Sequence, residues 1–237
     1  MTRTVAVIQA RLGSRRFPEK MMAVLCERSL LEWVVTRVGE SDAIDRVVVA
    51  TTAEPLDDRI VAECGRLGVD VVRGSTNDVL ARFVAAIDDD ECDTVVRVCA
   101  DNPFVDASCI AAVIDEHRST GADYSFNHRP FGACNYADGF GVEVITRSLL
   151  TELNRRDLSG EHREHVTLAI ADGSVKAHVR GCVAPPLLAR PELRFDVDEP
   201  QDLHHLQSLV DFARLHIGSR AVEVIAAQDL YRSTYPS

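Results

Sequence analysis

The chain has 237 residues, of which 46% are hydrophobic and 27% are charged, and its formal net charge is −11. A chain of this length can bury one sizeable core, so we expect a single domain over residues 1–237. The negative charge and an aromatic content of 5% disfavour nucleic acid as a partner.

Targeting and redox signals are weak throughout the chain. No apolar run approaches the roughly 20 residues that span a bilayer. The first apolar run, residues 5–8, passes directly into polar and cationic residues, unlike a signal peptide. The seven cysteines form no Cys-x-x-Cys pair. We therefore expect a reduced, cytoplasmic protein with no membrane partner.

The first half of the chain predicts strands and helices in alternation. The expected strands are Val5–Ile8, Arg46–Ala50, Val69–Val72 and Thr94–Val98, and the expected helices are Leu30–Val38, Leu56–Leu67, Val79–Ile87 and Ser108–Arg118. This alternation is typical of a parallel sheet that helices cover on both faces. The fold class that it predicts is α/β, a three-layer α/β/α sandwich with a mainly parallel sheet.

The second half of the chain has a looser pattern. Short strands are expected near Tyr124 and over Phe140–Ile145, Val175–Val179 and Arg194–Val197, and helices over Leu149–Arg155, His162–Ala171 and Gln201–His216. No repeat and no long linker divides the chain.

The loop after the first strand combines glycine with cations. Arg11, Arg15, Arg16 and Lys20 surround Gly13, and the first twenty residues carry five Lys/Arg against one Glu, a net charge of +4. A cationic loop on an acidic protein indicates a local site for phosphates. The fingerprints of dinucleotide oxidoreductases and P-loop NTPases are absent from this loop.

Three aspartates are candidate metal ligands. Asp101 follows a predicted strand, while Asp196 and Asp198 alternate along an extended segment and point to one side. Taken alone, an Asp-x-Asp pair is more often solvated, and Asp198 also suits a helix N-cap. Together with Asp101 and the cationic loop, the pattern favours Mg²⁺, which prefers hard oxygen ligands.

Several motifs carry a family resemblance. They are Ala10-Arg-x-x-Ser-x-Arg-x-Pro-x-Lys20, Ala50-Thr-Thr52, Arg73-Gly-Ser75 with Asp78-Val-Leu80, Arg97-Val-Cys-Ala-Asp-Asn-Pro103, Asp138-Gly139 with Val142-Glu-Val144, Arg163-Glu-His-Val-Thr167 and Arg194-Phe-Asp-Val-Asp-Glu-Pro-Gln-Asp-Leu203. In this order they resemble the CMP-sugar cytidylyltransferases, especially the spore-coat polysaccharide type, which is related to the CMP-KDO and CMP-sialic acid synthetases.

The resemblance implies a Rossmann-like nucleotide-diphospho-sugar transferase fold and a reaction. CMP passes from CTP to a sugar-acid, sugar-phosphate or phosphonate acceptor, and pyrophosphate leaves. Arg11, Lys20 and Asp101 are the implied catalytic residues. Asp101 and Asp198 match the family's metal-binding aspartates, whereas Asp196 departs from the spore-coat pattern. We also expect a homodimer.

The resemblance further implies the residues that hold the nucleotide. They are Ala10, Arg11, Gly13, Ser14, Arg15, Lys20, Arg73, Ser75 and Asp78. For the segment 73–78 an equally weighted alternative is an ordinary turn that leads into a helix capped by Asp78 or Asn77.

The acceptor would be an anionic small molecule. The implied contacts are Asp138, Gly139, Glu143, Arg163 and His165, with Arg163 reading the anionic group. The alternative for residues 161–164 is a solvated helix face. The family's usual Asp-Gly-Leu-Asp-Val-Glu stands here as Asp138-Gly-Phe-Gly-Val-Glu143, and Gly141 in place of a carboxylate predicts a wider pocket and a different acceptor.

Two other functions stay open at this point. Relatives of this fold include metal-dependent glycosyltransferases with an Asp-x-Asp, and a degenerate copy would bind nucleotide without catalysis. Cys99, close to Asp101, is interpreted as a packing group, because the reaction needs no protein nucleophile.

Overall fold

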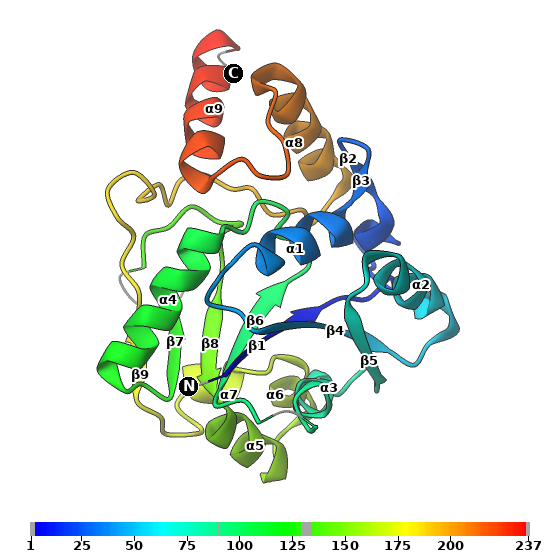
Figure 1. The fold of residues 1–237 in the computed structure, drawn as a ribbon, viewed down its shortest axis with the longest axis vertical. Helices are drawn as coiled ribbons and strands as arrows, with labels where there is room; N and C mark the ends of the chain where they lie inside the picture. Colours follow the sequence, from blue (N-terminus) through cyan, green and yellow to red (C-terminus); the bar gives the residue numbers. More distant parts are fainter. Residues whose placement is uncertain (1–2, 90, 129–133, 236–237) are drawn as a thin grey trace.

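The computed structural model describes residues 3–89, 91–128 and 134–235 (Figure 1). Seven strands form the main sheet: β1 (Thr4–Gln9), β4 (Arg46–Thr52), β5 (Asp70–Gly74), β6 (Thr94–Cys99), β7 (Tyr124–Phe126), β8 (Glu143–Thr146) and β9 (Val179–Gly181). A small hairpin of β2 (Val24–Leu25) and β3 (Arg28–Ser29) lies apart from it.

The strand order is β5-β4-β1-β6-β8-β7-β9. Every neighbouring pair is parallel except the two that β8 makes, with β6 and with β7. The expected mainly parallel sheet is confirmed. The chain leaves β1 for β4 on one side and later returns to β6 on the other, so the loops after β1 and β6 diverge where open α/β sheets bind ligands.

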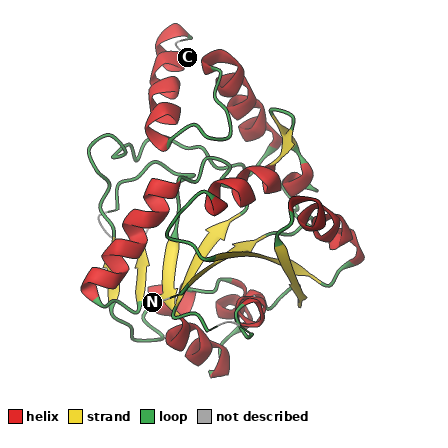
Figure 2. Ribbon diagram, viewed as in Figure 1, coloured by secondary structure: helices red, strands yellow, loops and turns green. Residues whose placement is uncertain are grey.

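Helices cover both faces of the sheet, so the three-layer sandwich is confirmed (Figures 1 and 2). One face carries α1 (Leu30–Gly39), α2 (Asp58–Leu67), α4 (Ala107–Thr120), α8 (Pro200–Ala213) and α9 (Ala221–Thr234). The other carries α3 (Val79–Ala86), α5 (Arg147–Arg155), α6 (Gly160–Glu164) and α7 (Leu168–Ala171). Two 3₁₀ turns, η1 (Lys20–Met22) and η2 (Pro55–Asp57), follow β1 and β4.

Side-chain alternation along the strands explains the two layers. On β1, Ala6 and Ile8 pack into the core on the α1 side, whereas Val5 and Val7 pack into the core on the α3 side, and all four are fully buried. A strand buried on both faces must be apolar at nearly every position, which is why residues 5–8 read as an unbroken apolar run.

Two predicted elements of the second half, a helix and a strand, were wrong, and one helix was not predicted. The expected helix His162–Ala171 is two short helices, because His165 leaves the helical conformation and Val166 and Thr167 turn into the core. The strand expected over Val175–Val179 instead spans Val179–Gly181. Helix α9 was not expected at all.

The strand expected over Arg194–Val197 is reduced to a single bridge between Arg194 and Asp138. The backbone of this segment instead forms hydrogen bonds with the loops that follow β1 and β6. Val197 donates to the carbonyl of Asp101 at 2.9 Å, and its own carbonyl accepts from Lys20 at 2.7 Å. These bonds tie residues 194–198 to the carboxyl ends of β1 and β6.

The cysteines are mostly buried, and the helices are too short or too polar to span a membrane within the part of the chain that the structure describes. None of the seven cysteines, all of which the structure describes, forms a disulfide, and five of them are buried. No helix within the described ranges is long and apolar enough to cross a membrane.

Candidate active site

A cavity of about 780 Å³ lies at the carboxyl ends of the central strands. It is lined by Gln9, Arg11, Gly13, Ser14, Arg15, Arg16, Lys20, Met21, Thr76, Asn77, Cys99, Ala100, Asp101, Glu164, His165 and Asp198. The structure thus brings together the cationic loop, two of the three predicted metal ligands and one of the predicted acceptor contacts. This volume suits a nucleotide-sized ligand.

The cationic loop is anchored by its apolar residues. Leu12 is fully buried, its N–H donates to Asp57 at 2.8 Å, and its carbonyl accepts from Glu19 at 3.0 Å. Gly13 lies at the open side, where an added Cβ would meet no atom within 4 Å. The burial and hydrogen bonds of Leu12 fix the backbone between Arg11 and the cations that follow it. The loop therefore keeps its shape while its charged side chains line the cavity.

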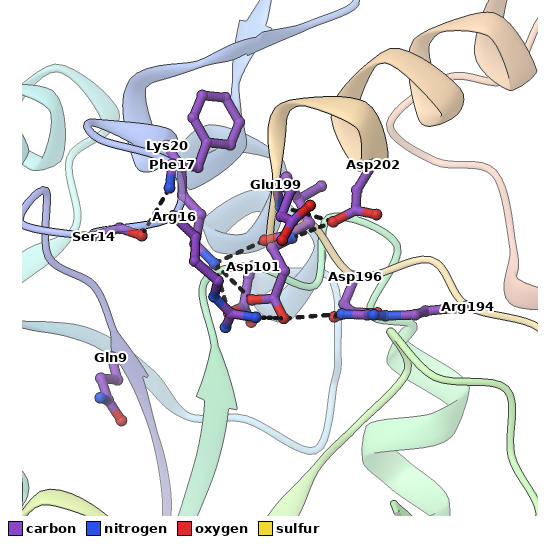
Figure 3. Close-up of polar contacts among 12 residues, drawn as sticks. Gln9, Ser14, Arg16, Phe17, Lys20, Asp101, Arg194, Asp196, Glu199 and Asp202 are labelled. Carbon is purple, nitrogen blue, oxygen red and sulfur yellow. Dashed lines mark hydrogen bonds and ion pairs between the residues drawn. The ribbon is translucent and has the colours of Figure 1, made fainter.

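Lys20 lies at the centre of a charged cluster (Figure 3). Its Nζ is 3.0 Å from Asp101 Oδ2, 3.5 Å from Asp198 Oδ1 and 2.7 Å from the carbonyl oxygen of Val197. The Lys20 side chain is 11% exposed. A single ammonium therefore joins three chain segments, those after β1, after β6 and before α8.

Further cations surround Asp198. Arg16 lies 3.0 Å from Asp198 Oδ2, and Arg194 donates to the same oxygen at 2.9 Å. Burial alone would raise the pKa of Asp198, but Lys20, Arg16 and Arg194 outweigh it and hold the pKa below its ordinary value. Asp198 is therefore ionised at neutral pH.

Asp196 differs from the other two predicted metal ligands. Arg194 binds both of its carboxylate oxygens at 2.6 Å, and Asp196 does not line the cavity. Asp198 does not cap α8 through its side chain; Glu199 and Asp202 form the capping box there. Among the residues that the structure describes, no group of three His, Cys, Asp or Glu side chains is arranged to hold a metal ion.

The segment 73–78 is built as a structural turn. Arg73 binds the carbonyls of Thr52 and Glu54 at 3.0 and 2.9 Å, and Asp78 caps α3 by accepting from Ala81 at 2.9 Å. The cap interpretation of Asp78 is confirmed. None of Arg73, Ser75, Asp78 or Ala10 lines the cavity, whereas Thr76 and Asn77, between two of them, do.

The predicted acceptor residues are scattered. Only His165 lines the main cavity. Arg163 donates from Nε to Asp78 at 2.7 Å and from Nη2 to Asn154 Oδ1 at 2.7 Å. These contacts fix α6 against the start of α3 and the end of α5. Its role toward an acceptor stays a prediction.

Asp138 and Gly139 lie against the segment that carries Asp196. Gly139 has φ of +94°, and a Cβ there would lie 2.7 Å from the backbone carbon of Phe195, so only glycine fits this close approach. Asp138 lines a second cavity of about 220 Å³ with His128 and Arg194. Burial and the neighbouring Asp196 raise the pKa of Asp138.

Glu143 is buried in the sheet and does not line either cavity. Its carboxylate accepts from Arg97 at 2.6 Å, from Tyr124 at 2.8 Å and from Thr167 at 3.1 Å. Its side chain is 5% exposed. Gly141, the departure from the family pattern, lies beside His128 and Asn102, which a Cβ would meet at 3.4 and 3.5 Å.

Cys99 lines the cavity without the properties of a nucleophile. Burial raises the pKa of its thiol to about 11, so the reactive thiolate is scarce at neutral pH.

Sequence reasoning missed several cavity residues. Gln9, Thr76, Asn77 and Glu164 were not proposed as ligand contacts, although each adjoins a residue that was. The available signal was position, since Gln9 is the last residue of β1 and Thr76 and Asn77 follow β5.

Comparisons with known proteins show which family the chain resembles. The family model described as Cytidylyltransferase matches residues 5–209. The spore coat polysaccharide biosynthesis protein SpsF of Bacillus subtilis is 34% identical over 209 residues, which is 86% of this chain and 84% of SpsF. 3-Deoxy-manno-octulosonate cytidylyltransferase 2 of Hydrogenovibrio crunogenus is 33% identical over 63% of this chain and 55% of its own length.

Among solved structures, a cytidylyltransferase from Leptospira borgpetersenii superposes with a TM-score of 0.88 at 26% identity, covering 98% of this chain and 96% of that one. The fold, the cationic loop and the matched length lead to the same assignment. The chain belongs to the cytidylyltransferase family and is a CTP-dependent nucleotidyltransferase.

Proposed function

We propose that this protein transfers CMP from CTP to an oxygen of an anionic sugar-type acceptor: a sugar acid, a sugar phosphate or a phosphonate. The acceptor oxygen bonds to the α-phosphorus, the bond from that phosphorus to the bridging oxygen breaks, and pyrophosphate leaves. A hydroxyl acceptor loses its proton to solvent or a nearby base, whereas a phosphate or phosphonate acceptor attacks through an oxygen that is already ionised. Polysaccharide biosynthesis, which the name of the SpsF relative states, is the process that we propose for it.

The position of Lys20 is the observation that carries this proposal. Its ammonium lies between Asp101 and Asp198 at the wall of the cavity that the cationic loop lines. Arg11, Arg15 and Arg16 face the same space. A leaving pyrophosphate gains negative charge in the transition state, and cations at the wall of the cavity stabilise that charge.

The cluster also fits a divalent cation. Two carboxylates, Asp101 and Asp198, converge on one cationic nitrogen, and their oxygens are the hard donors that Mg²⁺ prefers. Asp101 and Asp198 would hold the ion, and Asp196 is the third candidate once Arg194 releases it. When bound, Mg²⁺ would polarise the phosphoryl oxygens and neutralise their charge.

Once a metal ion binds Asp101 and Asp198, the Lys20 ammonium would be able to bind the phosphates instead. Because its side chain contacts both carboxylates only through its terminal nitrogen, a change of rotamer moves the ammonium toward the cavity. Arg16 has the same option, since its side chain is 63% exposed and bonds Asp198 at its tip. The cations that now neutralise the aspartates would then hold the triphosphate.

Pyrophosphate release is the direct test. The protein with Mg²⁺ is assayed with each of the four common nucleoside triphosphates against four acceptors: 3-deoxy-manno-octulosonate, N-acetylneuraminate, glucose 1-phosphate and 2-aminoethylphosphonate. We expect release with CTP and at least one acceptor, and little with the other triphosphates. Release that needs no acceptor, or equal use of all four triphosphates, would contradict the proposal.

A further inference from the structure

Gln9 is a cavity residue to which no role has been given. It is the last residue of β1, pairs in register with Cys99 on β6, and lines the 780 Å³ cavity. Figure 3 shows its side chain apart from the Lys20 cluster in that view. The question is what its amide offers to a ligand.

A buried ion pair orients this amide. Arg97 on β6 lies directly across from Glu143 on β8, and Arg97 Nη1 donates to Glu143 Oε2 at 2.6 Å. Burial alone would raise the pKa of Glu143, but Arg97 and His128 hold it well below its ordinary value. Since Tyr124 and Thr167 also bind this carboxylate, the pair is rigid and keeps its charges.

Arg97 fixes which end of the amide faces the cavity. Its Nη2 donates to Gln9 Oε1 at 3.3 Å. A guanidinium has only donors, so Gln9 must turn its oxygen to Arg97 and its NH₂ group away. Among the described residues, no group accepts a hydrogen bond from that nitrogen. Gln9 thus presents two N–H donors and no acceptor to a ligand.

The neighbours of Gln9 indicate which ligand it faces. The pyrophosphate side of the cavity is the cationic loop, and Thr76 and Asn77 lie after β5, two strands from β1. The Gln9 side chain contacts Arg97 on β6, the strand that also carries Cys99. His165 lines the same cavity. In-line displacement places the acceptor opposite the leaving group, which corresponds to this side.

We propose that Gln9 is a specificity-determining contact to the acceptor, donating from Nε2 to an oxygen of its carboxylate, phosphate or phosphonate. Arg97 is the residue that positions it, and Glu143 acts through Arg97. This inference rests on the proposed function. It also gives the buried Arg97–Glu143 pair a role near the acceptor, although Glu143 itself does not line the cavity.

Calorimetry on two variants tests the contact. Each of the four acceptors named above is titrated into wild-type protein saturated with the nonhydrolysable analogue α,β-methylene-CTP, and the tightest-binding one is used for the variants. We expect Gln9→Ala to weaken acceptor binding about tenfold, as a lost hydrogen bond to a charged group does. Gln9→Glu should weaken it further, because its carboxylate repels the anion.

The controls separate a contact from a general disturbance. Gln201→Glu adds the same charge on α8, outside the main cavity, and should change acceptor affinity by no more than about twofold. The CTP analogue should bind all variants as it binds wild type. Unchanged acceptor affinity in Gln9→Glu, or an equal loss for the CTP analogue, would overturn the inference.

Failure of the proposed function has a different signature. A wild-type protein that binds an acceptor in a Gln9-dependent way but releases no pyrophosphate from CTP would contradict the reaction and leave the Gln9 contact in place. Pyrophosphate release by wild type, together with unchanged acceptor binding in the Gln9 variants, would support the reaction and contradict the Gln9 contact.

Discussion

Lys20 Nζ lies 3.0 Å from Asp101 Oδ2, although 81 residues separate the two in the chain. The contact joins the loops that follow β1 and β6, two neighbouring parallel strands. Their side chains meet because both loops leave the same edge of the sheet. The ammonium and the carboxylate are thus arranged before any substrate binds.

Replacing Lys20 tests its proposed role in the transition state. We expect Lys20→Ala to lower kcat by roughly 10²–10³, the effect of removing one contact to developing charge. Binding of CTP should weaken less, because charge on the leaving pyrophosphate grows during the reaction. Lys20→Arg should restore activity only in part, since a planar fork replaces a point charge. Steady-state kinetics with calorimetric CTP binding measure both quantities.

The chain supplies a matched control, because Lys176 is its only other lysine and is exposed. Lys176→Ala should leave kcat and CTP binding unchanged. Full activity in Lys20→Arg, or an effect of Lys20→Ala on KM alone, would reduce Lys20 to a binding cation.

The three candidate metal ligands, Asp101, Asp196 and Asp198, should differ in how much each contributes to turnover. Asp101→Asn and Asp198→Asn should each lower turnover at saturating Mg²⁺ by roughly 10²–10³. Asp196→Asn should cost less, since Asp196 lies outside the cavity and binds Arg194. Asp211→Asn on the surface of α8 serves as control. Kinetics over a Mg²⁺ titration, with thermal unfolding as a check of folding, decide the order, and a fully active Asp101→Asn would remove that residue from the mechanism.

Glu143→Gln tests whether Glu143 stabilises the fold through its buried ion pair or binds the acceptor. Removing one partner of a buried ion pair costs about 3–5 kcal/mol of unfolding free energy. Because the folded pKa of Glu143 is depressed, its contribution is present above the unfolded pKa of about 4.3 and falls as the pH drops toward the folded pKa. The difference between wild type and Glu143→Gln should therefore shrink between pH 5 and about pH 3.

Urea denaturation of both proteins across that range measures this difference. A variant with wild-type stability and weakened acceptor binding would instead return Glu143 to the acceptor site.

Arg163→Ala should mainly lower the thermal stability of the protein. The contacts of Arg163 with Asp78 and Asn154 fix α6 against α3 and α5, and losing one charged hydrogen bond alone costs about 1.5 kcal/mol. For a chain of this size that lowers Tm by roughly 3–6 °C. Thermal unfolding and titrations of acceptor and CTP separate the outcomes. A tenfold loss of acceptor affinity at unchanged Tm would support the role that the sequence predicted for Arg163.

The central part of the fold could be predicted because its signals are local. Residues 5–8 are apolar at every position, and residues 46–50 and 94–98 are mostly apolar, as is typical of strands buried on both faces. The loop between Arg11 and Lys20 follows the first of these strands, and Asp101 follows the last. Parallel strands end at one edge, so these residues could be placed together without a structure.

The contacts that were missed depend on partners far apart in the chain. Glu143 alternates with Val142 and Val144, a pattern that suggests a solvent-facing side chain, but α7 and its neighbours cover that face and Arg97 neutralises the charge. Arg163 meets Asp78 across 85 residues. No local periodicity encodes such pairings.

The most direct measurement follows the phosphorus atoms of CTP by ³¹P NMR with wild-type protein, Mg²⁺ and the acceptor panel. CMP transfer predicts one pyrophosphate for each new CMP–acceptor conjugate, seen as a phosphodiester signal with a hydroxyl acceptor and as a phosphoanhydride signal with a phosphate or phosphonate acceptor. Both signals should grow roughly 10²–10³ times more slowly when Lys20→Ala replaces wild type. CTP that binds but stays intact with every acceptor, or that yields CDP and inorganic phosphate, would contradict the assignment of this site to cytidylyl transfer.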